Sequence, residues 1–156
     1  MIKLNLGCGN DIREGCINID VRQLERVDVV SSLENLPFED NYADWIVAQD
    51  VLEHFCKIEL IEVVKEIKRV LKPDGILEIR VPDCEQILNK YALKELDVDS
   101  ALGYIFGGQD YVQNVHKIGF TKMNCRYLLE LFGFTVLEIY TCDATNLRCV
   151  AKKVGE

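Results

Sequence analysis

Three features are missing from the sequence: a long uninterrupted apolar run, a cluster of lysine and arginine, and a Cys-x-x-Cys pair. Without about 20 consecutive apolar residues no membrane-spanning helix is predicted, and residues 1–6 lack the apolar stretch of a signal peptide. The charge is one-sided, since 26 acidic residues outnumber 18 basic ones and give a net charge of −8. Such an acidic surface repels phosphate and anionic lipid, so we expect neither general nucleic-acid binding nor membrane binding.

The cysteines predict neither disulfide bonds nor a metal centre. There are seven, an odd number, and their scattered spacings match no zinc motif. They are interpreted as small buried hydrophobic residues of a protein in a reducing compartment, for which we take the cytoplasm. The positions are Cys8, Cys16, Cys56, Cys84, Cys125, Cys142 and Cys149.

The length of 156 residues fits a single domain spanning 1–156, because domains usually contain about 100–200 residues. A hydrophobic fraction of 49% beside 28% charged residues is typical of a folded globular protein and argues against a disordered or fibrous chain. No repeat, low-complexity tract or linker divides the sequence.

Short apolar runs alternate with helical patterns along the chain. Strands are predicted at residues 2–6, 17–19, 27–30, 43–48, 76–81, 134–140 and 147–154. Helices are predicted at 53–72, near 84–94, and at 121–132 with Thr121 as N-cap. The apolar face of the first helix is assigned to Ile58, Ile61, Val64, Ile67 and Leu71, and that of the last helix to Tyr127, Leu128 and Leu131.

This alternation predicts an α/β fold with a mostly parallel sheet, whose last two strands form a hairpin. The first three strands are joined by short connections, whereas a parallel crossover normally needs a dozen residues or more. The early crossover helices are therefore expected to be short or missing. The two long helices instead follow the fourth and fifth strands, and right-handed crossovers place both on one face of the sheet.

The opposite face of the sheet should then be thinly covered. Polar residues alternate with apolar ones in these strands, whereas parallel strands buried on both sides contain continuous apolar runs. We expect this open face to be solvated or to form a homodimer. Trp45, on the fourth strand, is assigned to the core. The alternating polar residues are Lys3, Asn5, Asn18, Glu78, Arg80, Arg148 and Lys152.

The strongest local motif is a Gly-x-Gly turn after the first strand, in Leu4-Asn-Leu-Gly-Cys-Gly-Asn10. Glycines there let the backbone approach a ligand that a Cβ would exclude. The next strand ends at Asp20, where a carboxylate can accept hydrogen bonds from both hydroxyls of a ribose. Alone, each feature would be an ordinary turn. A dinucleotide fingerprint needs Gly or Ala in place of Ile12 and a helix N-terminus for the pyrophosphate, so a nucleoside without phosphate fits better than NAD.

Six motifs in order resemble the class I S-adenosylmethionine-dependent methyltransferases, and most closely the small type-11-like members. They are Leu-Gly-Cys-Gly at 6–9, Asn-Ile-Asp at 18–20, Leu-Pro-Phe-Glu-Asp-Asn-Tyr-Ala-Asp at 36–44, Val-Leu-Glu-His at 51–54, Lys-Pro-Asp-Gly-Ile-Leu at 72–77 and Leu-Leu-Glu-Leu-Phe-Gly-Phe at 128–134. The resemblance covers nearly the whole chain. It implies a Rossmann-like sheet of seven strands with an antiparallel C-terminal hairpin, and S-adenosylmethionine as cofactor, released as S-adenosylhomocysteine.

The resemblance also implies a role for each matching position. The glycine turn would wrap the amino-acid end of the cofactor, and the acid ending the second strand would hold the ribose hydroxyls. Residues 32–34 fall where the family contacts adenine, and the residue after the fourth strand lies beside the methionine portion. The implied cofactor-binding residues are Gly7, Cys8, Gly9, Asp20, Ser32, Leu33, Glu34 and Gln49.

Residues 104–116 are predicted to form a loop rich in glycine and aromatic residues. Long loops without secondary structure in compact domains are usually functional, and in the layout of the family this one covers the acceptor side of the cleft. Its substrate contacts are assigned to Tyr104, Gln109 and Tyr111. The alternative interpretation is a surface excursion with ordinary turn residues.

His116 is the candidate general base, because it lies in that loop and an imidazole titrates near neutral pH. The only other histidine, His54, and its neighbour Glu53 are given structural roles at the start of a helix. Cys8 is interpreted as a packing residue rather than a nucleophile.

The predicted function is methyl transfer from S-adenosylmethionine to the oxygen or nitrogen of a small-molecule or sugar-like acceptor. A non-catalytic cofactor-binding or partner module of the same fold is the alternative. An NAD-type enzyme is the weaker one, because the dinucleotide fingerprint is incomplete.

Overall fold

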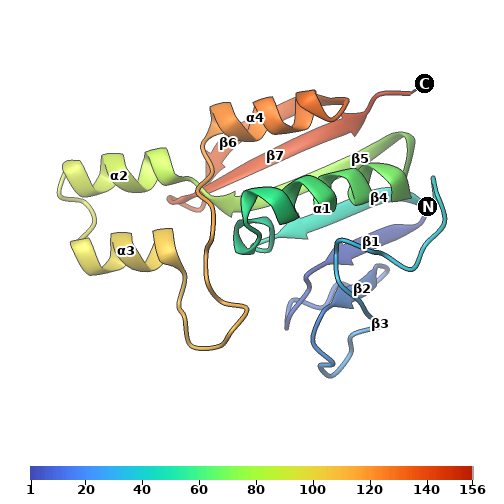
Figure 1. The fold of residues 1–156 in the computed structure, drawn as a ribbon. Helices are drawn as coiled ribbons and strands as arrows, with labels where there is room; N and C mark the ends of the chain where they lie inside the picture. The colour runs from blue at the N-terminus through green and yellow to red at the C-terminus, as the bar shows by residue number, and fades with distance from the viewer. Residues whose placement is uncertain (156) are drawn as a thin grey trace.

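The protein is described by a computed structural model that covers residues 1–155. Its elements follow the order β1 (Lys3–Leu6), β2 (Ile17–Asp20), β3 (Val29–Val30), β4 (Ala43–Gln49), the 3₁₀ helix η1 (Leu52–His54), α1 (Lys57–Val70), β5 (Leu71–Pro82), α2 (Cys84–Ala92), α3 (Val98–Phe106), α4 (Lys122–Leu131), β6 (Phe134–Cys142) and β7 (Asn146–Lys153) (Figure 1).

All seven strands form one sheet in the order β3-β2-β1-β4-β5-β7-β6. The pairs among β1 to β5 are parallel, and β7 runs antiparallel to both of its neighbours. Between β1 and β4 the described chain contains no helix. The predicted fold class is therefore confirmed, including the antiparallel hairpin at the C-terminal end and the missing early crossover helices.

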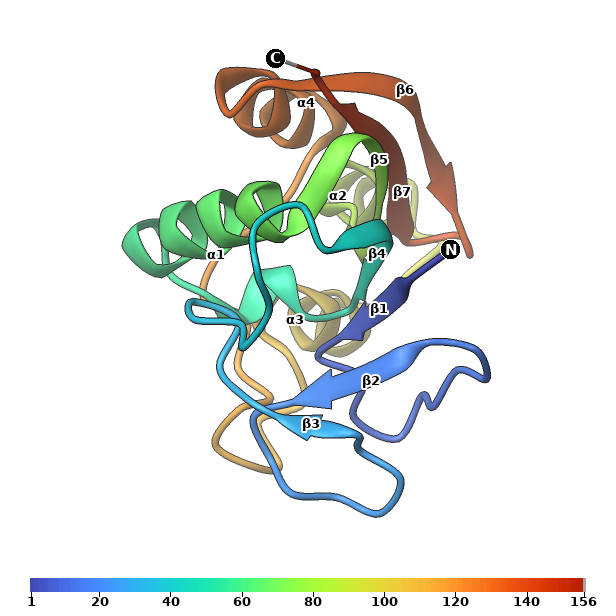
Figure 2. The same cartoon turned by 90° about the vertical axis from the view of Figure 1, so that its right-hand side faces the viewer.

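Helices α1 and α4 lie on the same face of the sheet, as right-handed crossovers predict (Figure 2). The hydrophobic core fills the space between these helices and the strands. Its fully buried side chains include Ile46 and Leu77 from the sheet, Ile67 from α1 and Leu129 from α4. Helices α2 and α3 form a hairpin that extends beyond the end of β5, away from this core (Figure 1).

The other face of the sheet carries no helix within residues 1–155 (Figure 2). The strand register brings the predicted polar residues together there, since Asn5 pairs with Asn18 and Val47, and Val47 in turn pairs with Glu78. The prediction of a polar face without a helix is therefore confirmed, although Asn5, Asn18 and Glu78 are buried on it. The residues that the register aligns on it are Lys3, Asn5, Asn18, Glu78, Arg80, Arg148 and Lys152.

Side-chain pairs take the place of apolar cover on this open face. Glu78 is 7% exposed, and its Oε1 accepts a hydrogen bond from Gln49 Nε2 at 3.1 Å and lies 2.9 Å from Arg148 Nη2. Trp45 lies on the same face, partly exposed, with the ammonium of Lys3 5.9 Å from its ring centre. The assignment of Trp45 to the core is therefore wrong, because the register turns its side chain away from the helices.

The helix predicted at 53–72 is wrong at both ends and on its buried face. It begins at Lys57 and ends before Leu71, which already belongs to β5. Ile58 and Ile61 are 78% and 37% exposed. The cause is geometric: each step of three residues turns about 300°, so three such steps rotate a row of side chains by about half a turn. The residues that α1 buries are Leu60, Val63, Val64, Ile67 and Val70.

Helix α4 also presents a different face from the predicted one. Tyr127 and Leu131 are 67% and 64% exposed, and the helix buries Cys125 and Leu129 instead. The predicted N-cap is confirmed, because Thr121 Oγ1 accepts a hydrogen bond from the backbone N–H of residue 124 at 3.2 Å.

Residues 98–106 form α3, where the sequence predicted the beginning of a loop. Its apolar residues have helical spacing, but Ala101 is its one buried residue, so the helix packs little against the core. It begins at Asp97, whose side chain caps the backbone N–H of Ser100 at 2.9 Å. Every helix within the described residues is too short or too polar to cross a membrane.

Candidate functional site

A cavity of about 530 Å³ opens where β1, β2 and β4 end. This edge is the usual ligand site of parallel sheets, at the point where the strand order reverses. The structure brings all eight predicted cofactor residues to its wall, although they come from four separate segments. They are Gly7, Cys8, Gly9, Asp20, Ser32, Leu33, Glu34 and Gln49.

The Gly-x-Gly turn forms one side of the cavity. Gly7 and Gly9 have φ values of +60° and +51°, in the left-handed region that favours glycine. A Cβ on Gly7 would overlap the side chain of Val51, which follows β4. The backbone N–H of Cys8 donates to Ile19 O at 2.9 Å and ties the turn to β2. A side chain at Gly7 would therefore push the end of β1 away from Val51, the residue that follows the end of β4.

Asp20 lies at the floor of the cavity with 4% of its surface exposed. Its Oδ2 accepts a hydrogen bond from Gly9 N at 2.8 Å, and its Oδ1 accepts from Arg22 N at 2.9 Å and Arg22 Nε at 3.1 Å. Burial alone would raise the pKa of Asp20, but these hydrogen bonds outweigh it and hold the pKa below its usual range. The carboxylate is therefore ionised at neutral pH.

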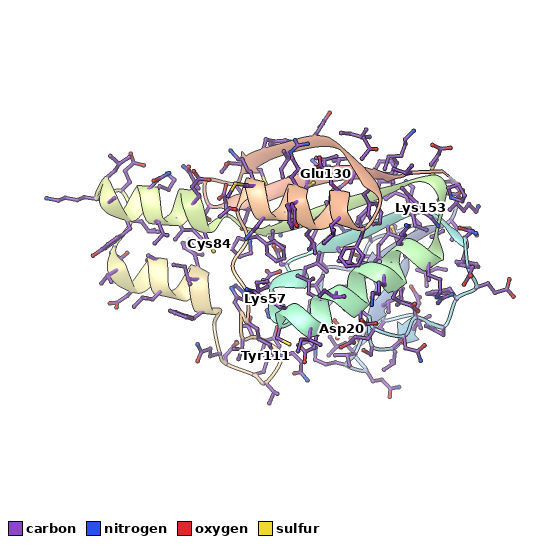
Figure 3. All side chains as sticks on the ribbon, turned by 45° about the horizontal axis from the view of Figure 1, so that its top comes forward. Asp20, Lys57, Cys84, Tyr111, Glu130 and Lys153 are labelled. Carbon is purple, nitrogen blue, oxygen red and sulfur yellow. The ribbon has the colours of Figure 1, made fainter. Side chains whose placement is uncertain are left out.

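Arg22 joins this acid to the loop that follows α3. Its guanidinium carbon lies 4.8 Å from the ring centre of Tyr111, and both side chains line the cavity. Figure 3 shows Asp20 and Tyr111 on the same side of the molecule, near Lys57 at the start of α1. The sequence analysis missed Arg22. Its position two residues after a strand-end acid is the signal that could have indicated it.

The wall expected to contact adenine is formed by residues 32–34. Leu33 is 4% exposed, and the hydroxyl of Ser32 donates to the carboxylate of Glu34. The side chain of Gln49 is held at the open face of the sheet, because its Oε1 accepts from Arg13 Nη2 at 2.6 Å. Arg13 belongs to the connection between β1 and β2, so this connection fixes the position of the Gln49 side chain in the cavity wall.

Cys8 has the properties of a packing residue. It is 4% exposed, and burial together with the charge of Asp20 raises the pKa of its thiol to about 11. A thiol of that pKa carries almost no thiolate at neutral pH, and the thiolate is the nucleophilic form.

The segment from 107 to 121, which joins α3 to α4, docks on the start of α1 and on η1. The backbone N–H of Lys117 donates to Glu53 O at 2.8 Å, and Lys117 Nζ donates to Glu59 Oε2 at 3.0 Å. Gly107 has a φ of +79°, and a Cβ there would come within 2.7 Å of the carbonyl oxygen of Asn114. These contacts hold the segment as a wall along the side of the cavity that His54 and Lys117 line.

Beneath this wall, the buried Glu53 lies beside the two partly buried histidines. Glu53 is 2% exposed, its Oε2 has no hydrogen-bond partner among the described residues, and burial raises the pKa of this carboxyl to about 8. His116 Nε2 lies 3.9 Å from Glu53 Oε1, and the rings of His54 and His116 meet edge to face with centres 5.0 Å apart. Burial and the neighbouring His54 lower the pKa of His116, so its ring is neutral at physiological pH.

The three residues predicted to contact the substrate do not lie together in the structure. Tyr111 lines the cavity on the side of Arg22, and Gln109 lies in the exposed turn ahead of it. Tyr104 belongs to α3, where its carbonyl accepts a hydrogen bond from His116 Nδ1 at 3.0 Å. Among the described residues that line the cavity, Tyr104, Gln109 and His116 are absent, whereas His54 is present.

One family model matches part of the chain. Residues 4–79, just under half of the chain, match the model of a methyltransferase domain. No curated protein matches the chain in sequence. The matched segment contains the glycine turn, the strand-end acid and η1.

Solved structures share the whole fold. The PH0226 protein of Pyrococcus horikoshii is 22% identical, with 97% of this chain and 81% of that chain covered at a TM-score of 0.69. A SAM-dependent methyltransferase of Methanosarcina mazei is 19% identical, with 99% and 92% covered at a TM-score of 0.70. The 1,6-didemethyltoxoflavin-N1-methyltransferase of Burkholderia thailandensis, bound to 1,6-didemethyltoxoflavin and S-adenosylhomocysteine, is 16% identical, with 98% and 71% covered at a TM-score of 0.70.

Proposed function

We propose that the chain is a class I S-adenosylmethionine-dependent methyltransferase and that it methylates a small-molecule or sugar-like acceptor at oxygen or nitrogen. The match of residues 4–79 to a methyltransferase domain and the fold shared with such enzymes support this proposal. The observation that carries the proposal is the pairing of the Gly7 turn with Asp20 in one cavity. Gly7 and Gly9 bring bare backbone to the cavity wall, and the buried Asp20 carboxylate accepts hydrogen bonds there from Gly9 and Arg22. Ribose hydroxyls would bind this carboxylate in place of the Arg22 side chain. The residues present therefore fit S-adenosylmethionine.

The cofactor supplies a methyl group on a sulfonium, already activated toward a nucleophile. The contribution of this chain is to align the acceptor and to exclude water, and alignment alone lowers a barrier by up to about 7–11 kcal/mol in favourable cases. The acceptor side of the cavity is lined by charged and polar groups, including Asp50, His54, Arg80 and Lys117. This lining favours a polar small molecule. The didemethyltoxoflavin complex of a fold relative supports that class.

His116 stays in the proposal as the predicted general base of the metal-free protein, although it is not among the described residues that line the cavity. Its Nδ1 is engaged by the Tyr104 carbonyl, so in the neutral ring Nε2 keeps the lone pair that could take a proton. On a hydroxyl or amine acceptor, His116→Ala should lower turnover while the affinity for S-adenosylmethionine stays nearly unchanged. Full turnover of that variant would leave His116 as a loop anchor only.

Calorimetry with S-adenosylmethionine and with NAD tests the cofactor. We expect binding of the first and none of the second, and the reverse would overturn the family assignment of the site. Mass spectrometry of a panel of hydroxyl-bearing and amine-bearing small molecules, incubated with protein and cofactor, then tests the reaction. Binding of the cofactor without a mass gain of one methyl group on any acceptor would favour the alternative, a non-catalytic module of the same fold.

We also propose that the open face of the sheet forms a homodimer. The face carries the partly exposed Trp45 among its polar residues, and no helix within residues 1–155 covers it. Sedimentation at micromolar concentration tests this, with Trp45→Glu as the variant expected to return a dimer to monomers. A monomer for the unchanged protein would leave this face solvated.

For location, we propose the cytoplasm, because seven free cysteines suit a reducing compartment. Reaction of the denatured protein with a thiol reagent should then label all seven cysteines, and blocked thiols in protein taken directly from cells would contradict it.

A further inference from the structure

Three potential metal ligands meet below the acceptor side of the cavity. One carboxylate oxygen of Glu53 and one ring nitrogen from each of His54 and His116 lie within 4.8 Å of one another. Glu53 and His54 are consecutive residues of η1, while His116 belongs to the segment from 107 to 121. Backbone hydrogen bonds from Lys117 and Ile118 to Glu53 O, at 2.8 and 3.3 Å, fix the two segments against each other.

Both imidazole rings are held by their Nδ1 atoms. His54 Nδ1 lies 3.1 Å from Val115 O, and His116 Nδ1 lies 3.0 Å from Tyr104 O. A carbonyl oxygen only accepts hydrogen bonds, so each neutral ring carries its proton on Nδ1 and keeps a lone pair on Nε2. Histidines that bind metals are oriented in this way, with the second nitrogen donating to a backbone carbonyl or a carboxylate.

Glu53, in contrast, lacks the partners that a buried carboxylate needs. Its side chain is 2% exposed, and its Oε2 is buried without a hydrogen-bond partner among the described residues. Its Oε1 faces His116 Nε2 at 3.9 Å, beyond hydrogen-bond distance. A buried carboxylate is strongly unfavourable unless a cation or a set of hydrogen bonds compensates it. A cation bound there would compensate the charge of this oxygen and engage both imidazole lone pairs at once.

We propose that Glu53, His54 and His116 bind one divalent first-row transition-metal ion. Two imidazole nitrogens and one carboxylate oxygen suit Zn²⁺ or Fe²⁺ better than Mg²⁺ or Ca²⁺, which prefer oxygen ligands. Metal–ligand distances of about 2.0–2.2 Å put neighbouring ligand atoms about 3.5 Å apart, so the cluster closes by about 1 Å on binding. Three protein ligands leave at least one coordination position open, as in catalytic sites.

The open position faces the acceptor. His54 lines the cavity, whereas Glu53 and His116 lie behind it, so an exogenous ligand reaches the ion from the cavity side. The ion would there bind an oxygen donor, either water or a hydroxyl group of the acceptor. This last step rests on the proposed methyl transfer, whereas metal binding itself does not.

Nuclear magnetic resonance of the imidazole nitrogens tests the site on the unchanged protein, since the chain has only two histidines. Protein produced with ¹⁵N-labelled histidine is freed of metal with a chelator and then titrated with Zn²⁺. We expect the Nε2 signals of both rings to shift together and to saturate at one equivalent. A shift of neither ring or of one ring alone would overturn the proposal, and so would zinc bound only by the seven cysteine thiols.

Variants identify the third ligand. Glu53→Gln should weaken Zn²⁺ binding at least tenfold, while Glu62→Gln, on an exposed part of α1 where it pairs with Lys65, should leave it unchanged. Circular dichroism checks that each variant is folded. If Glu53→Gln does not fold, the NMR titration of the unchanged protein decides whether the histidines bind zinc. Calorimetry with S-adenosylmethionine on the chelated protein is the separate readout. Zinc binding without cofactor binding would refute the proposed function alone, and cofactor binding without zinc would refute this site alone.

Discussion

The guanidinium of Arg22 lies between the carboxylate of Asp20, which it contacts through Nε at 3.1 Å, and the ring of Tyr111, 4.8 Å from its centre. Asp20 ends β2, while Tyr111 belongs to the segment after α3. One side chain therefore connects the cofactor end of the cavity to the segment that covers its acceptor side.

Removal of the Tyr111 ring tests this connection. Tyr111→Ala should weaken the binding of S-adenosylmethionine about two- to fivefold, because a cation–π contact at an exposed position is worth about 0.5–1 kcal/mol. Tyr111→Phe keeps the aromatic face and should stay closer to the wild type. Calorimetry on the two variants provides the measurement. Equal affinities for the alanine and phenylalanine variants would show that the ring does not act through Arg22.

The carboxylate itself should matter more. Asp20→Ala or Asp20→Asn should lower the affinity for S-adenosylmethionine about tenfold or more, since a hydrogen bond to a charged group contributes about 1.5–3 kcal/mol. Asp44→Asn is the matched control, because Asp44 pairs with Lys72 where β4 begins, at the opposite end of the sheet from the cavity. Unchanged affinity of the Asp20 variants by calorimetry would remove this residue from the site.

The same carboxylate predicts a dependence of stability on pH. Its pKa is depressed in the folded protein, so its stabilising contribution is fully present above the unfolded-state value of about 3.9 and is lost as the pH falls through the folded-state pKa. The measurement is urea unfolding of wild type and Asp20→Asn across pH. The difference in unfolding free energy should be constant above about pH 5 and shrink below about pH 4. A difference that grows on acidification would contradict the assignment.

The glycine turn can be tested with a matched pair of glycines. Gly7 and Gly15 have φ values of +60° and +77°, but a Cβ would overlap Val51 at Gly7 and meets nothing within 4 Å at Gly15. Gly15→Ala should cost only the left-handed strain of about 1–2 kcal/mol. Gly7→Ala should cost clearly more in urea unfolding and should also weaken cofactor binding. Equal costs would mean that Val51 moves aside freely.

The cofactor side of the site could be predicted from sequence because its signals are local. A strand-end glycine turn and a strand-end acid are each contained in a few residues, and the parallel sheet then brings Gly7 and Asp20 to one edge. The open face could be predicted for a similar reason, since period-two alternation assigns side chains to a face without knowledge of their partners.

The acceptor side could not be predicted in the same way. Glu53 and His116 meet only because the segment from 107 to 121 returns to η1, a contact held by backbone hydrogen bonds that leave no pattern in the sequence. Helix α3 has apolar residues at helical spacing, but it buries only Ala101, so few packing contacts fix its position. The sequence marked this region as unusual through its glycines and aromatic residues, but its geometry depends on tertiary contacts.

The buried face of α1 was misassigned for a geometric reason, and that difference can be measured. Ile67 is fully buried in the core, whereas Ile58, placed on the same face by the sequence, is 78% exposed. Ile67→Ala should lower the free energy of unfolding by about 2–5 kcal/mol, through lost burial and the cavity left behind. Ile58→Ala, the same truncation on the same helix, should change it by no more than about 0.5 kcal/mol. Urea unfolding of the two variants gives the comparison. Similar losses would mean that Ile58 is covered in solution, as a partner docked on the start of α1 would do.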